Sequence, residues 1–167
     1  MFNMKNFLCI FVLLQLLFST YPFCHQDVFY ASFCDKADSF CYVVKNENDV
    51  LNDEQTRVKC GQYSFVYFQG QPDISLNALY LQARIRDVSL LSSIIAELNI
   101  QIVFEEHFPN LYNSEEEEAN SGDIRQIIYG YANKFTKYVY LNGYKINIQI
   151  VVKNCLIIGY PMVYTGF

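Results

Sequence analysis

The sequence predicts an α+β fold, a mostly antiparallel sheet with one main helix packed on it. Residues 144–153 alternate between aliphatic and polar side chains, which is typical of a strand. Asn142-Gly143 stands directly before them and is a strong signal for a two-residue hairpin turn. Residues 88–98 carry apolar side chains at helical spacing between strand-like segments. A sheet and a helix of this kind bury their apolar faces against each other as layers.

The first 24 residues predict an export signal. They hold one basic residue, Lys5, and no acidic one, and residues 7–18 are apolar at every position but one. This run is shorter than the roughly 20 residues that cross a membrane. Neither Ser19 nor Cys24 offers a good cleavage site, so the alternative is an uncleaved anchor. We expect a secreted or extracytoplasmic protein, attached to a membrane only through this segment if it stays uncleaved.

The chain divides into three parts. Residues 1–24 form the signal peptide or N-terminal anchor, and residues 25–56 form a cysteine-rich segment with a polar linker. Residues 57–167 form the α+β domain. The boundary rests on residues 46–56, which are polar and acidic and read as an exposed loop. Residues 25–45 receive no secondary-structure assignment.

Strand-like patterns open the predicted domain on both sides of Gly61. Residues 76–86 follow as a strand, with the apolar residues Leu79, Leu81, Ala83 and Ile85 expected on one face. Asp87 or Ser89 can cap the helix over residues 88–98, and Glu97 with Asn99 marks its end. Residues 100–104 return to strand. The acidic run 115–118 reads as a solvated loop, because it lacks the pattern of a calcium-binding loop.

The last third predicts the clearest strands, over residues 124–131, 138–141, 144–153 and 155–158. In the third of these, a period of two predicts that the aliphatic side chains share one face and the amides the other. The aliphatic set is Ile146, Ile148, Ile150 and Val152, and the amides are Asn147 and Gln149.

Three short motifs at this end of the chain carry a family resemblance. They are Tyr129-Gly130-Tyr131, the run from Asn142 to Ile150, and Ile157-Ile158-Gly159-Tyr160-Pro161. Over about residues 88–167 the chain resembles the YwmB-like proteins, a family of exported proteins of Gram-positive spore-forming bacteria. The family is sometimes labelled TATA-box-binding-like on fold grounds. The resemblance implies an exported protein in a surface or sporulation context, and it implies no catalytic residues.

The charge balance argues against a nucleic-acid partner. The chain has a net charge of −5, with 12 basic and 17 acidic residues. Beyond residue 24 the count is 11 basic against 17 acidic residues, a net of −6, and no basic cluster compensates. Nucleic-acid binding depends on neutralising phosphates with Lys and Arg. We therefore do not expect DNA or RNA as a partner.

Cysteines permit disulfides if the protein is exported. Cys34 and Cys41 could close a small loop, and Cys60 and Cys155 could pair across the sheet. The alternative is free, buried thiols, which pack as small apolar side chains. No Cys-x-x-Cys motif occurs and the two histidines lie far apart, so we expect no metal site and no cofactor.

The catalytic alternative is a small secreted hydrolase with a Cys–His pair at His107. Glu105 and Glu106 precede it, but adjacent residues on a strand face opposite ways and do not converge for acid–base chemistry.

Tyrosines form the candidate binding surface, because a tyrosine combines a large contact area with a polar tip. The alternative is that they pack on cross-strand neighbours. The first hypothesis is thus a non-enzymatic exported module that contacts a protein or cell-envelope component. The hydrolase is the second, and a nucleic-acid binder of TATA-box-binding-like fold is the third. The candidate binding residues are Tyr129, Tyr131, Tyr138, Tyr140 and Tyr144.

Overall fold

The computed structural model describes residues 26–45, 55–60, 62–68, 78–108 and 124–164. Their elements, in chain order, are α2 (Gln26–Phe33), β1 (Ser39–Lys45), β2 (Gln55–Cys60), β3 (Tyr63–Phe68), β4 (Ala78–Ile85), the 3-10 helix η1 (Val88–Leu90), α3 (Leu91–Glu97), β5 (Gln101–His107), β6 (Gln126–Tyr131), β7 (Val139–Leu141), β8 (Tyr144–Ile146), β9 (Ile148–Val152) and β10 (Leu156–Tyr160). The predicted export segment and the acidic run 115–118 lie outside these ranges, as does most of the predicted linker. No helix among the described residues is long and apolar enough to cross a membrane.

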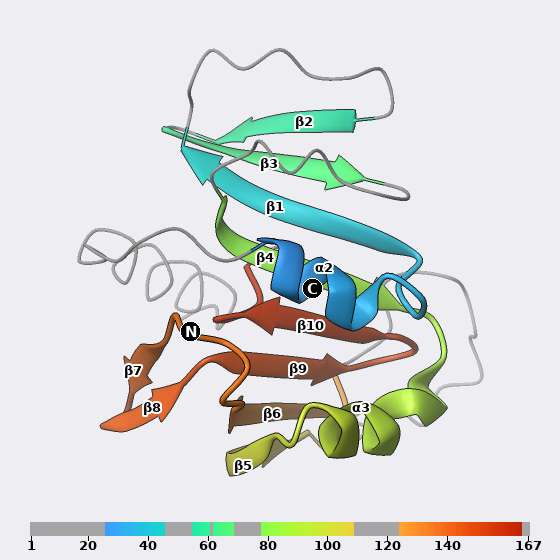
Figure 1. Cartoon of the computed structure of the whole chain (residues 1–167), viewed down its shortest axis with the longest axis vertical. Coiled ribbons are helices and arrows are strands. Elements are labelled where there is room, and N and C mark those ends of the chain that lie inside the picture. The colour runs from blue at the N-terminus through green and yellow to red at the C-terminus, as the bar shows by residue number, and fades with distance from the viewer. Residues whose placement is uncertain (1–25, 46–54, 61, 69–77, 109–123, 165–167) are drawn as a thin grey trace, which may run out of the picture.

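Eight of the described strands form one sheet in the order β2-β3-β1-β4-β10-β9-β6-β5, and β7 and β8 form a separate two-stranded sheet (Figure 1). Every pairing in the sheet is antiparallel, which confirms the mostly antiparallel fold. Within the described ranges, α2 and α3 are the two α-helices, where the sequence predicted one main helix. Both contribute to the same apolar core on one face of the sheet.

The cysteine-rich segment 25–56 contributes elements to this same sheet. Its strand β1 lies between β3 and β4 and pairs with both along its length. The helix α2 places Phe29 and Phe33, four residues apart, on one helix face, and both are fully buried. Residues 26–45 therefore share their strand pairing and their core with the predicted α+β domain.

The predicted helix over residues 88–98 is confirmed as η1 followed by α3. Asp87 caps it, because its Oδ1 accepts hydrogen bonds from the backbone N–H of Ser89 (2.9 Å) and from the Ser89 hydroxyl (2.6 Å). The helix ends at Glu97, and Asn99 takes a left-handed φ of 48°. Asparagine tolerates that conformation better than most residues, which fits its place after the helix.

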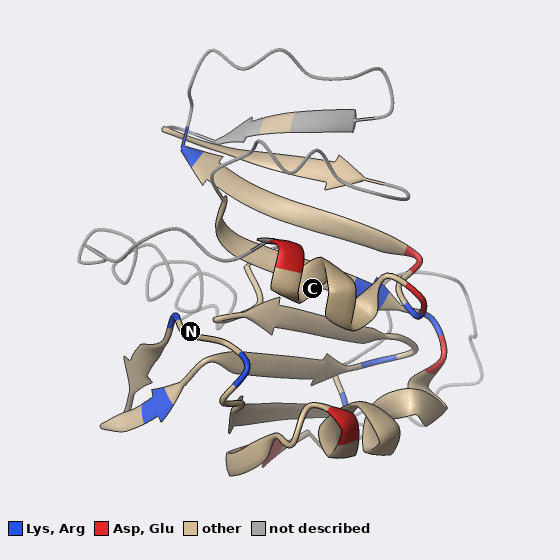
Figure 2. Cartoon of the chain, viewed as in Figure 1, with Lys and Arg blue, Asp and Glu red and all other residues tan. Residues whose placement is uncertain are grey.

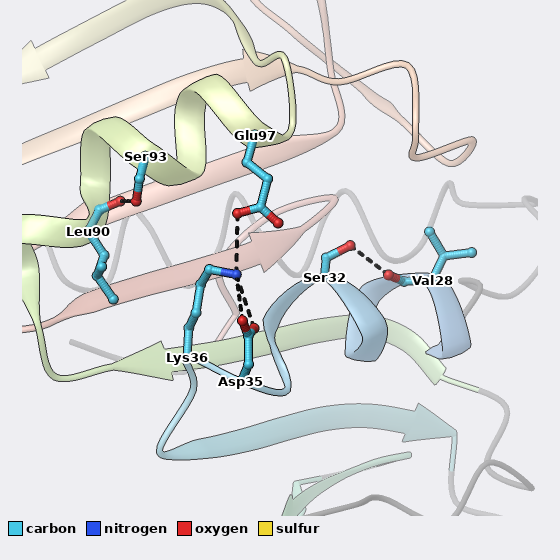
Figure 3. Close-up of polar contacts among 7 residues, drawn as sticks. All are labelled: Val28, Ser32, Asp35, Lys36, Leu90, Ser93 and Glu97. Carbon is cyan, nitrogen blue, oxygen red and sulfur yellow. Dashed lines mark hydrogen bonds and ion pairs between the residues drawn. The ribbon is translucent and has the colours of Figure 1, made fainter.

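A short polar network joins the two helices (Figure 3). The Lys36 ammonium, just after α2, lies 3.3 Å from a Glu97 carboxylate oxygen at the end of α3 and 3.0 Å from Asp35. Within α2, the Ser32 hydroxyl donates to the Val28 carbonyl at 2.7 Å. The hydrogen bond from Lys36 lowers the pKa of the Asp35 carboxyl.

The strand β4 shows where simple alternation fails. Leu81, Ala83 and Ile85 face the main core together, as the sequence predicted. Leu79 does not join them and packs instead against a small cluster built on Val43 and Tyr80. The pairing of β1 with β4 shifts register between Val43 and Val44, so a bulge reverses the faces there.

The central strands β9 and β10 are buried on both faces. One face packs on the main core with α2 and α3. The other carries Val151 and Ile157 against a second cluster that includes Leu141 and Ile146 of the β7–β8 hairpin and the C-terminal residues Met162 and Val163. The hairpin therefore covers part of the sheet face opposite the helices, at the side of β6 (Figure 1).

The predicted single strand over residues 144–153 is wrong at Asn147, where the chain divides into β8 and β9. Ile148, Ile150 and Val152 face the main core, but Ile146 belongs to the opposite cluster. Asn147 itself is fully buried and makes side-chain hydrogen bonds to the backbone of residues 132–135. A buried amide has to satisfy its donors and acceptor, and here that need interrupts the strand.

Residues 162–164 cross the sheet face opposite the helices, directly over Gly159. The backbone N–H of Val163 donates to the Gln149 side chain at 2.9 Å, and that of Tyr164 donates to the Gln82 side chain at 3.2 Å. Both glutamines pair in register with Gly159, from β9 and β4. A Cβ on Gly159 would collide with the backbone of Met162 and Val163, so the crossing requires glycine.

Candidate functional site

The β7–β8 hairpin presents two exposed tyrosines at one end of the molecule. Its turn, Asn142-Gly143, has φ values of 51° and 83°, as a type I′ turn requires, so the predicted hairpin is confirmed. Tyr140 is 61 % exposed and Tyr144 is 55 % exposed. Exposed apolar side chains that lie near one another mark candidate interaction sites, whereas single ones are common on any protein surface.

The two faces of this hairpin have different roles. In the strand register Tyr140 lies opposite Lys145, and Leu141 lies opposite Tyr144. Leu141 is buried in the cluster beneath the hairpin, which fixes the hairpin on the sheet. Tyr140 and Lys145 belong to the other set of alternating positions and are exposed.

Two tyrosine rings converge on the Lys145 ammonium. Its Nζ lies 3.9 Å from the ring centroid of Tyr138 and 4.9 Å from that of Tyr131, which is within the range of a cation–π contact. Tyr140 packs edge-on against Tyr138, with centroids 5.5 Å apart. Lys145 takes part in none of the ion pairs among the described residues. We name Tyr131, Tyr138, Tyr140 and Lys145 the aromatic–lysine cluster.

Tyr129 and Tyr144 lie outside this cluster and meet around Phe104 of β5. Tyr129 is buried and stacks on Phe104 with centroids 4.3 Å apart, while Tyr144 lies 6.0 Å from the same ring. The Tyr129 hydroxyl donates to Glu106 at 3.3 Å. Burial, and secondly the Glu106 charge, raise the pKa of Tyr129, so its hydroxyl stays protonated as a donor. Tyr129 is therefore a packing residue.

A buried amide holds the approach to the hairpin in place. Asn147 Nδ2 donates to the carbonyls of Ala132 (2.8 Å) and Phe135 (2.7 Å), and its Oδ1 accepts from the Ala132 N–H at 2.7 Å. These bonds pin the turn that carries the chain from Tyr131 to Tyr138. The sequence reasoning missed Asn147 and Lys145, although an asparagine within an apolar run was a visible signal of a buried polar role.

Cys34, Cys41 and Cys155 carry free thiols. Cys34 is exposed just after α2, on the side of the helices, whereas Cys41 alternates with the core residues Phe40 and Tyr42 and points to the opposite face. The sheet thus separates this predicted pair. Cys155, also predicted to pair, is buried and free beside β10. Three strands separate β10 from the strand of Cys60, a distance of about 19 Å, which no disulfide spans.

The histidine of the catalytic alternative lies on the edge strand β5. His107 is exposed, and its Nε2 lies 3.2 Å from the Glu105 carboxylate. Cys41 and Cys155 are both buried, and burial raises the pKa of the Cys41 thiol to about 12. A thiol with so high a pKa is a poor nucleophile at neutral pH. Among the described residues, no group of three or more His, Cys, Asp or Glu side chains could hold a metal ion.

The chain was also compared with family models, with curated proteins and with solved structures, and none of them matches it.

Proposed function

We propose that this protein is an exported, non-enzymatic α+β module that acts by binding a protein or cell-envelope component through the β7–β8 hairpin. The observation that carries this proposal is the exposure of Tyr140 and Tyr144 on a hairpin whose other side chains, Leu141 and Ile146, pack on the sheet. Tyrosine is enriched in binding surfaces because it loses little conformational entropy for a large contact area.

The hairpin is preorganised for binding. Its turn has the backbone conformation that its sequence favours, and Leu141 and Ile146 anchor it to the buried cluster below. Asn147 fixes the preceding turn through three hydrogen bonds. A rigid contact surface loses less entropy when a partner binds.

Export belongs to the proposal through residues 7–18, whose apolar run matches a secretory signal. The resemblance to YwmB-like proteins further suggests a surface or sporulation context. Mass spectrometry of the protein recovered from culture tests the export step, because it identifies the compartment and the mature N-terminus in one measurement.

Binding is tested by sedimenting the protein with isolated cell envelopes of its source. The double variant Tyr140→Ala, Tyr144→Ala should stay in the supernatant, while the unchanged protein sediments. Val58→Ala is the matched control, because Val58 is 50 % exposed on β2 at the other end of the sheet. Equal sedimentation of the double variant and the control would contradict the proposed role of the hairpin.

A further inference from the structure

The net charge of the whole chain conceals a strong asymmetry. All 17 acidic residues and seven of the 12 basic residues precede position 124. The five remaining basic residues follow it, so residues 124–167 carry a charge of +5 without one acidic side chain. The acidic character of the whole chain therefore comes from residues 1–123.

Position in the fold decides which of these five cations can meet a partner. Lys137 and Lys153 are buried. Arg125 is exposed, but it precedes β6 at the end of that strand remote from Tyr131. Lys145 is exposed on β8, and Lys134 is exposed in the segment between β6 and β7. Figure 2 shows no acidic residue on β7, β8 or that segment.

The surroundings of Lys145 leave its positive charge available to an anion. Two ring faces fix its ammonium, and the described ion pairs leave it without a carboxylate partner. Ring faces attract the charge but do not accept the N–H groups as a carboxylate does, so the exposed ammonium can still donate a hydrogen bond to an anion. A carboxylate arriving here would form a charge-assisted hydrogen bond.

We propose that the aromatic–lysine cluster binds an acidic glycan, with a sugar carboxylate on Lys145 and a sugar ring on Tyr140. The C–H groups on a sugar face are weakly positive and complement the negative face of an exposed tyrosine ring. Tyr140 is open enough to offer that face. This inference rests on the proposed function and names the chemical class of its envelope partner.

The number of cations distinguishes this ligand from a nucleic acid. A nucleic-acid site neutralises several phosphates along a continuous basic track. The hairpin region offers two exposed cations, Lys134 and Lys145, in a chain with a net charge of −5. One carboxylate and one stacked ring per sugar match one lysine and one open tyrosine.

The experiment titrates the full chain with polygalacturonate by isothermal calorimetry. Dextran serves as the neutral glycan, polyglutamate as the acidic peptide and oligothymidylate as the nucleic acid. We expect polygalacturonate to bind and dextran not to bind. The affinity should fall with salt with a logarithmic slope no steeper than about −2, because two exposed lysines are available.

Substitutions assign that binding to the cluster. Lys145→Gln and Tyr140→Ala should each weaken polygalacturonate binding about tenfold, which corresponds to one charge-assisted bond or one lost stacking contact. Lys145→Arg should retain binding because it keeps the charge over the rings. Lys45→Gln is the matched control, since Lys45 is an exposed lysine at the end of β1. Circular dichroism melting verifies that each variant is folded.

Two kinds of result would overturn the inference, and they differ from failure of the proposed function. Unchanged binding by Lys145→Gln, or tighter binding to polyglutamate or oligothymidylate than to polygalacturonate, would reject the acidic glycan as the ligand. Binding to isolated envelopes without binding to polygalacturonate would reject the glycan and keep the proposed function. If neither envelopes nor polygalacturonate bind, both are wrong.

Discussion

Replacing Asn147 by alanine would remove three side-chain hydrogen bonds from the base of the hairpin. The Asn147 amide is fully buried, and its partners are the Ala132 N–H, the Ala132 carbonyl and the Phe135 carbonyl, at 2.7 to 2.8 Å. Each bond contributes about 1 kcal/mol net, and a buried group left without a partner adds a further penalty. We therefore expect Asn147→Ala to lower the free energy of unfolding by about 4 kcal/mol.

Urea unfolding followed by far-ultraviolet circular dichroism measures this loss, since the chain has no tryptophan for fluorescence. Asn133→Ala is the matched control, because Asn133 is exposed in the same turn, and surface changes usually cost no more than about 0.5 kcal/mol. A loss below about 1 kcal/mol for Asn147→Ala would refute the role we give to this amide.

Asn147→Asp tests the same network by pH. Aspartate keeps an acceptor for the Ala132 N–H but directs a carboxylate oxygen at two carbonyls, so its folded-state pKa should rise. A raised pKa means that the protonated form is favoured in the folded protein. The destabilisation should therefore be smallest at acidic pH and grow as the pH rises through the unfolded value of about 3.9. A pH-independent loss would contradict this reasoning.

Three further predictions concern other parts of the fold. Gly159→Ala should cost about 3 kcal/mol or more in urea unfolding, because its Cβ meets the backbone of Met162 and Val163. Gly143→Ala is the control, because the new Cβ would enter open space at a φ of 83°, and it should lower the free energy of unfolding by only about 1 kcal/mol. Equal losses of stability in the two variants would argue against the crossing at Gly159. In alkylation at neutral pH, mapped by mass spectrometry, Cys34 should react in the folded protein and Cys41 only after unfolding, because burial raises the Cys41 pKa to about 12. Equal rates would contradict that burial. Lys36 lowers the pKa of Asp35, so their pair stabilises the fold above the unfolded value of 3.8, and this contribution is lost as the pH falls through the lowered folded-state pKa. Lys36→Met should therefore be less stable than the unchanged protein at neutral pH and nearly equal to it in strong acid, and a difference that persists in acid would count against the pair.

Local patterns in the sequence identified the elements whose structure depends on near neighbours. The Asn142-Gly143 turn needs two positive φ values, which few other residue pairs adopt easily, and the structure confirms this predicted turn. The predicted helix over residues 88–98 is also confirmed. The Asp87 side chain caps its start, and the left-handed Asn99 follows its end, so both signals act on residues close in the chain. These signals lie within one turn of chain.

Other predictions failed where a distant segment decides the outcome. Ile146 follows the alternation of its neighbours in sequence, yet it packs on the opposite face because Asn147 bonds to residues 132–135. Leu79 leaves its predicted face because β1, more than 30 residues earlier in the chain, pairs with β4 through a bulge. The strand β1 showed no alternation in the sequence, because it is buried on both faces.

The candidate site was also predictable only in part from the sequence. Composition pointed to the tyrosines of the C-terminal sheet, since an aromatic side chain with a polar tip suits a binding surface in any fold. Only the tertiary structure separates the buried Tyr129 from the open Tyr140 and brings Tyr131 and Tyr138 to Lys145. The sequence by itself determined local turns, caps and most strands, because short-range backbone preferences set them. The faces, the strand order and the aromatic–lysine cluster depend on contacts between distant residues, which alternation along the chain does not encode.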